Sequence, residues 1–209
     1  MDGNGMNDDP VKKTPRPQAS VSTRRGDGGV TRLGGGEQIS KADSRVEAYG
    51  AIDELNTVIG LARTRCTDPQ ICSEIRTIQR ELFIVGSAIS TRVESKKPIP
   101  DITKEMVHAL DALVERLESE PNILRDWSIP GEFVQSAGFD VARAICRRAE
   151  RASVRYVTAG GIVQPTVLEY LNRLSDVLWL CARVIEARNG IDARLRDDEH
   201  PGPPWSRAW

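Results

Sequence analysis

Apolar side chains recur every three or four residues along five stretches of this chain, and this spacing predicts five amphipathic α-helices. The stripes of the first two helices are formed by Val46, Tyr49, Ile52, Leu55, Ile59 and Ala62, and by Ile71, Ile75, Ile78, Leu82, Val85 and Ile89. The other three stripes are formed by Val107, Leu110, Val114 and Leu117; by Val141, Ile145, Ala149 and Ala152; and by Leu171, Leu174, Leu178, Cys181 and Ile185. The sequence therefore predicts an all-α fold.

Capping signals set the approximate bounds of these helices. Residues 44–47 read Ser-Arg-Val-Glu, a capping box that predicts the serine as the N-cap of the first helix. The aspartate and proline at residues 68–69 predict the start of the second helix. The fourth pattern runs from about 133 to 157, and the fifth begins near Pro165 and stops at the Asn-Gly pair of residues 189–190.

The three- and four-residue spacing and the short connections favour antiparallel neighbours in an up-down, left-handed bundle of five helices. Residues 1–20 are polar and contain almost no large apolar side chains, so we expect a disordered tail. The folded domain is then residues 21–190, with a glycine-rich segment at its start. Residues 191–209 are expected to form a C-terminal tail, from which Trp205 and Trp209 could dock onto the domain.

Composition and charge exclude several classes of protein. Lysine plus arginine (29) nearly balances aspartate plus glutamate (30), so no overall field attracts nucleic acid or an anionic membrane. No apolar run approaches the ~20 residues of a membrane span, and the polar N-terminus lacks the apolar core of a signal peptide. We interpret the four cysteines, which form no C-x-x-C pair, as buried reduced thiols of a cytoplasmic protein. Two histidines give poor support to a histidine-rich metal centre, so no metal ligand is assigned.

The glycine-rich segment at residues 23–36 is the first candidate site. Its glycines let backbone amides approach an anion closely, and its hydroxyls and cations, with Lys41 beyond them, supply further donors. It is not a Walker A loop, because the pattern G-x-x-x-x-G-K-[ST] is absent. A flexible linker is the alternative, but the mixture of threonines and charged residues favours phosphate binding.

Arginines recur every four residues in the fourth helix, at Arg143, Arg147 and Arg151, so they share one helix face at intervals of about 6 Å. Guanidinium groups with this spacing can bind successive phosphates bidentately. A solvated face with charge pairs four residues apart is the alternative interpretation. RNA binding is a further alternative, against which the balanced charge and the lack of an aromatic stacking surface speak.

Polar residues interrupt the apolar stripe of the fifth helix. Asn172 shares a helix face with Asp176, and Arg173 lies beside them. Polar side chains at the edge of a core need partners. Both a ligand site and a structural hydrogen-bond network are therefore open interpretations of this segment.

Together these segments resemble the PduO-type ATP:corrinoid adenosyltransferases. Four motifs of that family have counterparts in the same order here: residues 23–29 (TRRGDGG), 40–56 (SKADSRVEAYGAIDELN), 147–151 (RRAER) and 170–176 (YLNRLSD). The resemblance covers about residues 22–190. Four ordered motifs at compatible spacing form a specific signal, which none of them gives alone.

The resemblance implies a helical bundle that assembles as a homotrimer with active sites between neighbouring subunits. It also implies transfer of the 5′-deoxyadenosyl group of ATP to cob(I)alamin or a related corrinoid, with release of triphosphate and a requirement for Mg²⁺. The nucleotide-binding residues that it implies are Thr23, Arg24, Arg25, Gly26, Thr31, Arg32, Lys41, Arg147, Arg148, Glu150, Arg151 and Asn172. The catalytic residues that it implies are Arg147, Arg151 and Asp53, with an ion pair between Asp53 and Arg147 across the subunit boundary.

The sequence departs from the family pattern at several positions. Arg25 replaces the usual threonine, and residues 127–132 read WSIPGE where the family commonly has F-x-x-P-G-G. The resemblance therefore matches Trp127 to the phenylalanine that helps hold the corrinoid without its lower axial ligand, and Asp140 to a histidine. A diverged relative that binds ATP or a corrinoid as a sensor or carrier is the alternative function. A flavoprotein reductase or a cobalamin-dependent enzyme is an expected partner; nucleic acid and membrane are not.

Overall fold

The computed structural model describes residues 22–92, 95–96, 98–197 and 199–202. These contain the helices α1 (Ser44–Arg65), α2 (Pro69–Ser90), α3 (Lys104–Glu118), α4 (Val134–Thr158) and α5 (Pro165–Arg188). An antiparallel hairpin of β1 (Val30–Arg32) and β2 (Gln38–Ser40) precedes them. The predicted all-α bundle of five up-down helices is confirmed. The predicted tail at 1–20, together with Trp205 and Trp209, lies outside the described residues.

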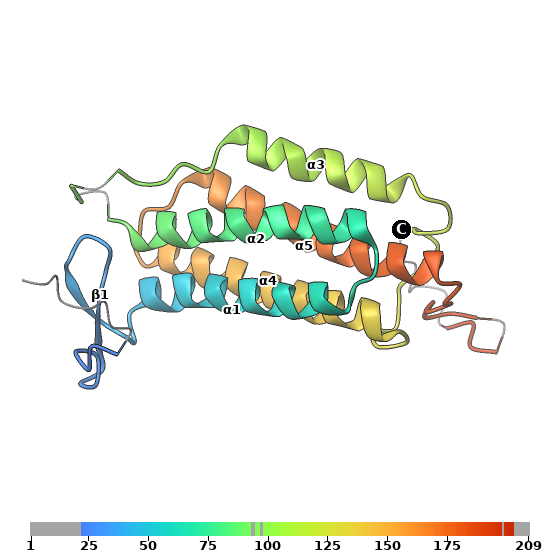
Figure 1. Ribbon diagram of the computed structural model, residues 1–209, viewed down its shortest axis with the longest axis horizontal. Helices are drawn as coiled ribbons and strands as arrows, with labels where there is room; N and C mark the ends of the chain where they lie inside the picture. Colours follow the sequence, from blue (N-terminus) through green and yellow to red (C-terminus); the bar gives the residue numbers. More distant parts are fainter. Residues whose placement is uncertain (1–21, 93–94, 97, 198, 203–209) are drawn as a thin grey trace, which may run out of the picture.

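The helices alternate in direction along the chain, and the hairpin lies at the end of the bundle where α1 begins (Figure 1). α1 packs against α2 and α4, and α4 also packs against α5. These three pairs are antiparallel, as expected. α3 instead packs against α5 and runs parallel to it. A hydrogen bond from Ile102 N to Gln164 Oε1 (3.0 Å) joins their starts, and the Arg188–Glu120 ion pair joins their ends. The long connection after α2 makes this possible, because it returns the chain to the α5 side.

Most residues of the predicted stripes form the core or pack against it; the exceptions are Val46 on α1, which is half-buried outside the core, and Val141 on α4. Ile52, Leu82 and Leu171 are among the largest fully buried side chains. Val141 was predicted to face the core but is 53% exposed, whereas Ala142 next to it is buried. The core face of α4 consists mainly of small residues, because α1 approaches closely: a Cβ placed on Gly138 would lie 2.9 Å from Ala62 Cα. No helix of the described residues is long and apolar enough to cross a membrane.

Aspartates cap the first two helices. The N-cap of α1 is Asp43, whose side chain accepts a hydrogen bond from Arg45 N at 2.8 Å, so the prediction of Ser44 as the cap was wrong by one residue. Ser44 already lies in the helix, since the extended backbone of Asp43 places its carboxylate over the first turn. Asp68 caps α2 as predicted and accepts hydrogen bonds from Gln70 N and Ile71 N, both at 3.0 Å.

The four cysteines are free thiols, in agreement with their interpretation from the sequence. Burial raises the pKa of Cys66 to about 11 and raises the pKa of Cys146 and Cys181 even further. A thiol with a raised pKa carries little thiolate at neutral pH, so these cysteines are structural groups.

Candidate nucleotide and corrinoid site

The glycine-rich segment folds into a turn followed by the hairpin. Gly29 N donates to Gly26 O at 3.1 Å, and Lys41 N donates to Gly29 O at 2.9 Å. Pairing of Thr31 with Ile39 brings the end of β2 back beside the turn. The hairpin therefore places Lys41 next to Gly26, fifteen positions earlier in the printed sequence.

Gly26 is required by the close approach of Lys41. A Cβ at this position would lie 3.2 Å from Lys41 Nζ and 3.1 Å from Val30 O. Without a side chain at residue 26, the ammonium group rests directly against the backbone of the turn. A cation beside a glycine turn is a favourable place for a phosphate group.

Cations dominate the exposed surface of this turn and hairpin. Arg24, Arg25, Arg32 and Lys41 are exposed, and none of them forms an ion pair within the part of the chain that the structure describes. Thr23 is also exposed, and Thr31 is half-buried in β1. Unpaired cations repel one another and gain when an anion binds between them, so this surface is suited to a polyphosphate.

The hairpin meets α1 and α4 at a hollow of about 300 Å³. Lys41 lines it from the hairpin, Glu54 from α1 and Arg148 from α4, and Arg148 forms an ion pair with Glu54. The structure thus joins two of the predicted nucleotide-binding residues, Lys41 and Arg148, within one chain.

A second hollow, of about 350 Å³, lies between the hairpin, α1 and α2. Arg32 and Asp53 line it together with the aromatic rings of Tyr49 and Phe83, and the Phe83 ring is 69% exposed. Among the described residues, no side chain forms an ion pair with Asp53. The acidic group therefore faces an open surface of the chain.

Arg147 and Arg151 lie on the face of α4 that points away from α1. Arg147 and Arg151 are exposed, whereas Arg148 turns toward α1. Arg143 is half-buried, and its Nε atom is shielded from solvent without a hydrogen-bond partner among the described residues. Arg147 and Arg151 are thus available to an anion that approaches from outside the chain.

Asn172 and Asp176 of α5 face this arginine surface. Asn172 Nδ2 donates to Glu150 Oε1 at 3.4 Å, and Arg173 forms ion pairs with Asp111 and, at 3.7 Å, with Asp176. Burial raises the pKa of Asp176, and the nearby positive charges of Arg173 and Arg147 oppose this shift. A structural network therefore accounts for Arg173, while Asn172 stays exposed beside Glu150.

Trp127 lies far from all these residues. It belongs to the loop before α4, whereas the hairpin lies at the end of the bundle where α4 stops (Figure 1). The 25 residues of α4 correspond to a length of about 37 Å. The predicted site residues are therefore divided among the hairpin and α1, the outer face of α4 and α5, and the distant Trp127 loop.

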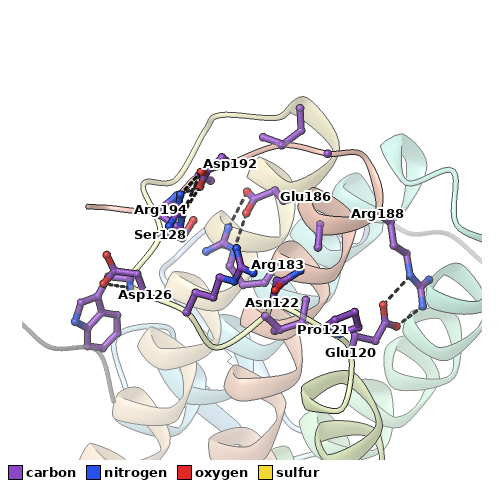
Figure 2. A pocket seen from close by; sticks show the side chains of 17 residues that line it. Glu120, Pro121, Asn122, Asp126, Ser128, Arg183, Glu186, Arg188, Asp192 and Arg194 are labelled. Atoms are coloured by element: carbon purple, nitrogen blue, oxygen red, sulfur yellow. Dashed lines mark hydrogen bonds and ion pairs between the residues drawn. The ribbon is translucent and has the colours of Figure 1, made fainter. Parts of the chain in front are cut away.

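Trp127, 44% exposed, borders a cavity of about 430 Å³ (Figure 2). Arg183 and Glu186 line this cavity. Arg183 forms ion pairs with Asp140 at 2.9 Å and with Glu186 at 2.8 Å, and the Ser136 hydroxyl donates a hydrogen bond to Glu186 at 2.7 Å. Arg183 and Glu186 were not among the site residues predicted from the sequence. Their signal was a charged pair three residues apart inside the apolar fifth pattern.

The described residues contain no group of three or more histidine, cysteine, aspartate or glutamate side chains that could form a metal cage. Mg²⁺ is usually held by substrate phosphates and water with only one or two carboxylates. The residues present are compatible with an ion that enters with the triphosphate of ATP.

The cation-rich hairpin and the arginines of α4 lie on a bundle of five α-helices. Residues 21–185 match the family described as "Cobalamin adenosyltransferase", and this chain belongs to that family. It is 39% identical over 173 residues to a corrinoid adenosyltransferase of Bacillus subtilis, covering 81% of this chain and 88% of the relative. It is 34% identical over 177 residues to a corrinoid adenosyltransferase of Citrobacter freundii, covering 83% and 98%.

A solved structure shows the same fold with both ligands. It is a variant of the PduO-type ATP:corrinoid adenosyltransferase from Lactobacillus reuteri, complexed with cobalamin and ATP. The TM-score is 0.79 at 27% sequence identity, with 86% of this chain and 100% of the other chain covered. The resemblance inferred from the four motifs is thus confirmed at the level of the family.

Proposed function

We propose that this chain transfers the 5′-deoxyadenosyl group of ATP to cob(I)alamin or a related corrinoid. The electron pair of cobalt(I) forms a bond to the ribose 5′ carbon, the bond from that carbon to oxygen breaks, and triphosphate leaves with the bonding electrons. The observation that carries the proposal is the cationic surface of the hairpin, whose Arg24, Arg25, Arg32 and Lys41 form no ion pair with any described residue, in a member of this family. The corrinoid supplies a very strong nucleophile, so the protein needs only to align the substrates and stabilise the leaving group.

The proposed triphosphate site is built on Gly26 and Lys41. The Lys41 ammonium group lies against the glycine turn, and the flanking Thr23, Arg24 and Arg25 are exposed beside it. Further nucleotide contacts are assigned to Thr31, Arg32, Arg147, Arg148, Glu150, Arg151 and Asn172. In a site of this kind, cations fixed before the reaction stabilise the charge that develops on the departing triphosphate. The ion Mg²⁺ would add to this by binding phosphate oxygens.

We propose that the complete site forms between subunits of a homotrimer. Asp53 and Arg147 lie on different surfaces of one chain. Asp53 lines the hollow between the hairpin, α1 and α2, whereas the positive charge of Arg147 lies near Asp176 of α5 and opposes the rise of its pKa. The two charges are therefore available for a pair across the subunit boundary. The same geometry separates the hairpin from Trp127 of its own chain, so a second copy has to supply the corrinoid side.

Trp127 is assigned to the lower face of the corrinoid. Its half-exposed indole borders a cavity large enough to admit part of a ligand. A bulky apolar ring against cobalt would exclude water and the displaced lower ligand. Loss of the axial donor lowers the energy of the orbital that accepts an electron, which makes reduction to cob(I)alamin easier.

We place this activity in the cytoplasm, in keeping with four free thiols of which three are buried. A reductase, such as a flavoprotein, has to supply the electron that forms cob(I)alamin. A cobalamin-dependent enzyme is the natural recipient of the product.

A mixing experiment tests the shared site. Arg147→Ala and Asp53→Asn should each be inactive alone, because each leaves one interfacial charge without its partner. In mixed trimers, some subunit boundaries join the unaltered Asp53 of one variant to the unaltered Arg147 of the other, so activity should return in part. The measurement is single-turnover transfer from ATP to reduced cobalamin, with sedimentation to establish the trimer. A fully active monomer would overturn the proposal.

A corrinoid or ATP carrier without efficient transfer is the second candidate. The observation that favours it is the buried Asp140–Arg183 pair, at a position where the resemblance expects a histidine. The same single-turnover assay distinguishes the two functions: a carrier binds both ligands but forms no cobalt–carbon bond.

A further inference from the structure

The segment after α5 returns to the loop that carries Trp127. Residues 191–197, named the strap here, run antiparallel to this loop, with a bridge between Ser128 and Arg194. Leu195 N donates to Trp127 O at 2.7 Å, and Ile129 N donates to Ala193 O at 2.8 Å. The beginning of the segment that the sequence assigned to the C-terminal tail thus contacts the folded domain.

One ion pair fastens the strap to the residue before Trp127. Arg196 Nε lies 3.0 Å from Asp126 Oδ1 and 2.9 Å from Oδ2, and its Nη2 also binds this carboxylate. The backbone amide of Arg196 donates to Asp126 Oδ2 at 3.0 Å. Asp126 is 8% exposed although it lies in a loop, so the pair is shielded from water and stronger than a surface ion pair.

The same carboxylate binds Trp127 itself. Asp126 Oδ1 accepts a hydrogen bond from Trp127 N at 2.8 Å, while the Trp127 carbonyl accepts from Leu195. Both polar backbone groups of Trp127 are therefore engaged, one by Asp126 and the other by the strap. Fixing the backbone on both sides of a residue restricts the directions that its side chain can take.

We propose that Asp126 and Arg196 are positioning residues for the corrinoid: through the strap, they fix the indole of Trp127 at the cavity where the corrinoid binds. This inference rests on the proposed function for its ligand. It goes beyond it by assigning a role to residues that none of the four sequence motifs contains. Figure 2 shows Asp126 beside the cavity, with Ser128, Asp192 and Arg194 of the paired segments nearby.

A carboxylate at the end of the strap provides the matched control. Asp197 Oδ1 accepts hydrogen bonds from Glu199 N at 3.0 Å and from His200 N at 2.6 Å, and Asp197 does not line the cavity. Asp197→Asn removes a carboxylate from the same segment without removing a bond to the Trp127 loop. Asp126→Asn and Arg196→Met break the bond between strap and loop.

The test measures three quantities in these variants. They are the separate KM values for cob(I)alamin and ATP, the spectrum of four-coordinate cob(II)alamin with ATP bound, and hydrogen–deuterium exchange of residues 124–133. Breaking the Asp126–Arg196 ion pair should raise the corrinoid KM about 10- to 100-fold, as expected when a substrate-orienting group is displaced. The ATP KM should stay within about twofold, because the hairpin is unaltered. The four-coordinate spectrum should weaken and the loop should exchange faster.

Asp197→Asn should match the wild type in all three measurements, and Arg196→Lys should recover part of the corrinoid affinity. Unchanged exchange in Asp126→Asn would show that the pair does not hold the loop. Faster exchange with an unchanged corrinoid KM and spectrum would reduce the pair to a structural role, and an equal rise in both KM values would do the same. If the wild-type protein binds no corrinoid, the proposed function fails, and exchange alone decides whether the Asp126–Arg196 ion pair orders Trp127.

Discussion

The two ends of the bundle treat their charges in opposite ways. At the hairpin end, Arg24, Arg25 and Lys41 are exposed and form no ion pair within the described residues. At the other end, charges are paired: Arg196 with Asp126, and Arg183 with Asp140 and Glu186. Cations without an ion-pair partner can bind an anionic ligand, whereas paired charges fix the shape of a cavity. One end thus offers exposed positive charge, and the other offers a surface whose shape is fixed by ion pairs.

This difference fits the two proposed substrates. Triphosphate carries several negative charges, and the cations that meet it lose little by being exposed before it binds. The corrin ring is broad and largely apolar, so it needs a shaped surface rather than charge. Variants of the cations assigned to ATP should therefore affect ATP binding, and variants of the Trp127 loop should affect corrinoid binding.

The largest effect is expected from Arg147→Ala, because it removes a phosphate contact and leaves the partner's charge across the boundary unpaired. Truncating one side of such a pair costs about 2–5 kcal/mol. ATP affinity by calorimetry and single-turnover transfer should both fall severely. The control is Arg148→Ala, which loses the exposed ion pair with Glu54 and should have a smaller effect. A critical Arg148 beside a silent Arg147 would show that we have assigned the wrong face of α4.

Trp127→Ala should act on the corrinoid alone. Losing a half-exposed tryptophan contact should cost about 2 kcal/mol, roughly half the cost of emptying a buried tryptophan site. The four-coordinate cob(II)alamin spectrum should disappear and transfer should slow, while ATP affinity is kept. Trp127→Phe should retain much of both properties. If Trp127→Ala changes only the melting temperature, the indole is a packing group and the corrinoid binds elsewhere.

Gly26→Ala should weaken ATP binding about tenfold, because the new Cβ displaces the Lys41 ammonium group and a hydrogen bond to a charged group is worth about 1.5–3 kcal/mol. The added atom would lie 3.2 Å from Lys41 Nζ. Gly28→Ala is the matched control, since a Cβ there meets nothing within 4 Å. Helical content by circular dichroism and corrinoid affinity should not change in either variant. Equal ATP affinity of the two variants would contradict the assigned role of Lys41.

The smallest effect concerns pH. Hydrogen bonds from Arg196 lower the pKa of Asp126 to about 2, below the usual value of about 3.9. A folded-state pKa below the unfolded one stabilises the protein above about pH 4, and this contribution is lost as the pH falls toward 2. Carboxyl NMR should find Asp126 ionised at pH 3. Asp176, whose pKa is raised by burial, should titrate at a higher pH than Asp126.

Much of the fold follows from local sequence patterns. Residues such as Leu55, Leu82 and Leu171 lie on stripes with the period of a helix, and all three are buried as predicted. The phase of the α4 stripe is harder to recognise, because its buried face is made mainly of small residues. Val141 is larger and more apolar than Ala142, yet Val141 is exposed and Ala142 is buried, on a helix face that lies close to α1 at Gly138.

The candidate site was predictable only where its residues are close in sequence. The glycine-rich motif and the arginine repeat were visible as patterns, and the structure brings Lys41 and Arg148 to one hollow. Arg183 and Glu186 were missed, because a charged pair in an apolar stripe does not reveal the residue that it binds. Asp140, the partner of Arg183, lies 43 positions before it.

The sequence by itself determined five helices, the cation-rich glycine segment and the family, because each depends on neighbouring residues and on motif spacing. That this segment forms a β-hairpin was not predicted. Only the tertiary structure decided that α3 packs beside α5, that Trp127 lies at the end opposite the hairpin, and that the strap returns to it. Asp126 and Arg196 are 70 positions apart. A contact over such a distance is selected by the packing of the whole bundle, and no local pattern of either residue records it.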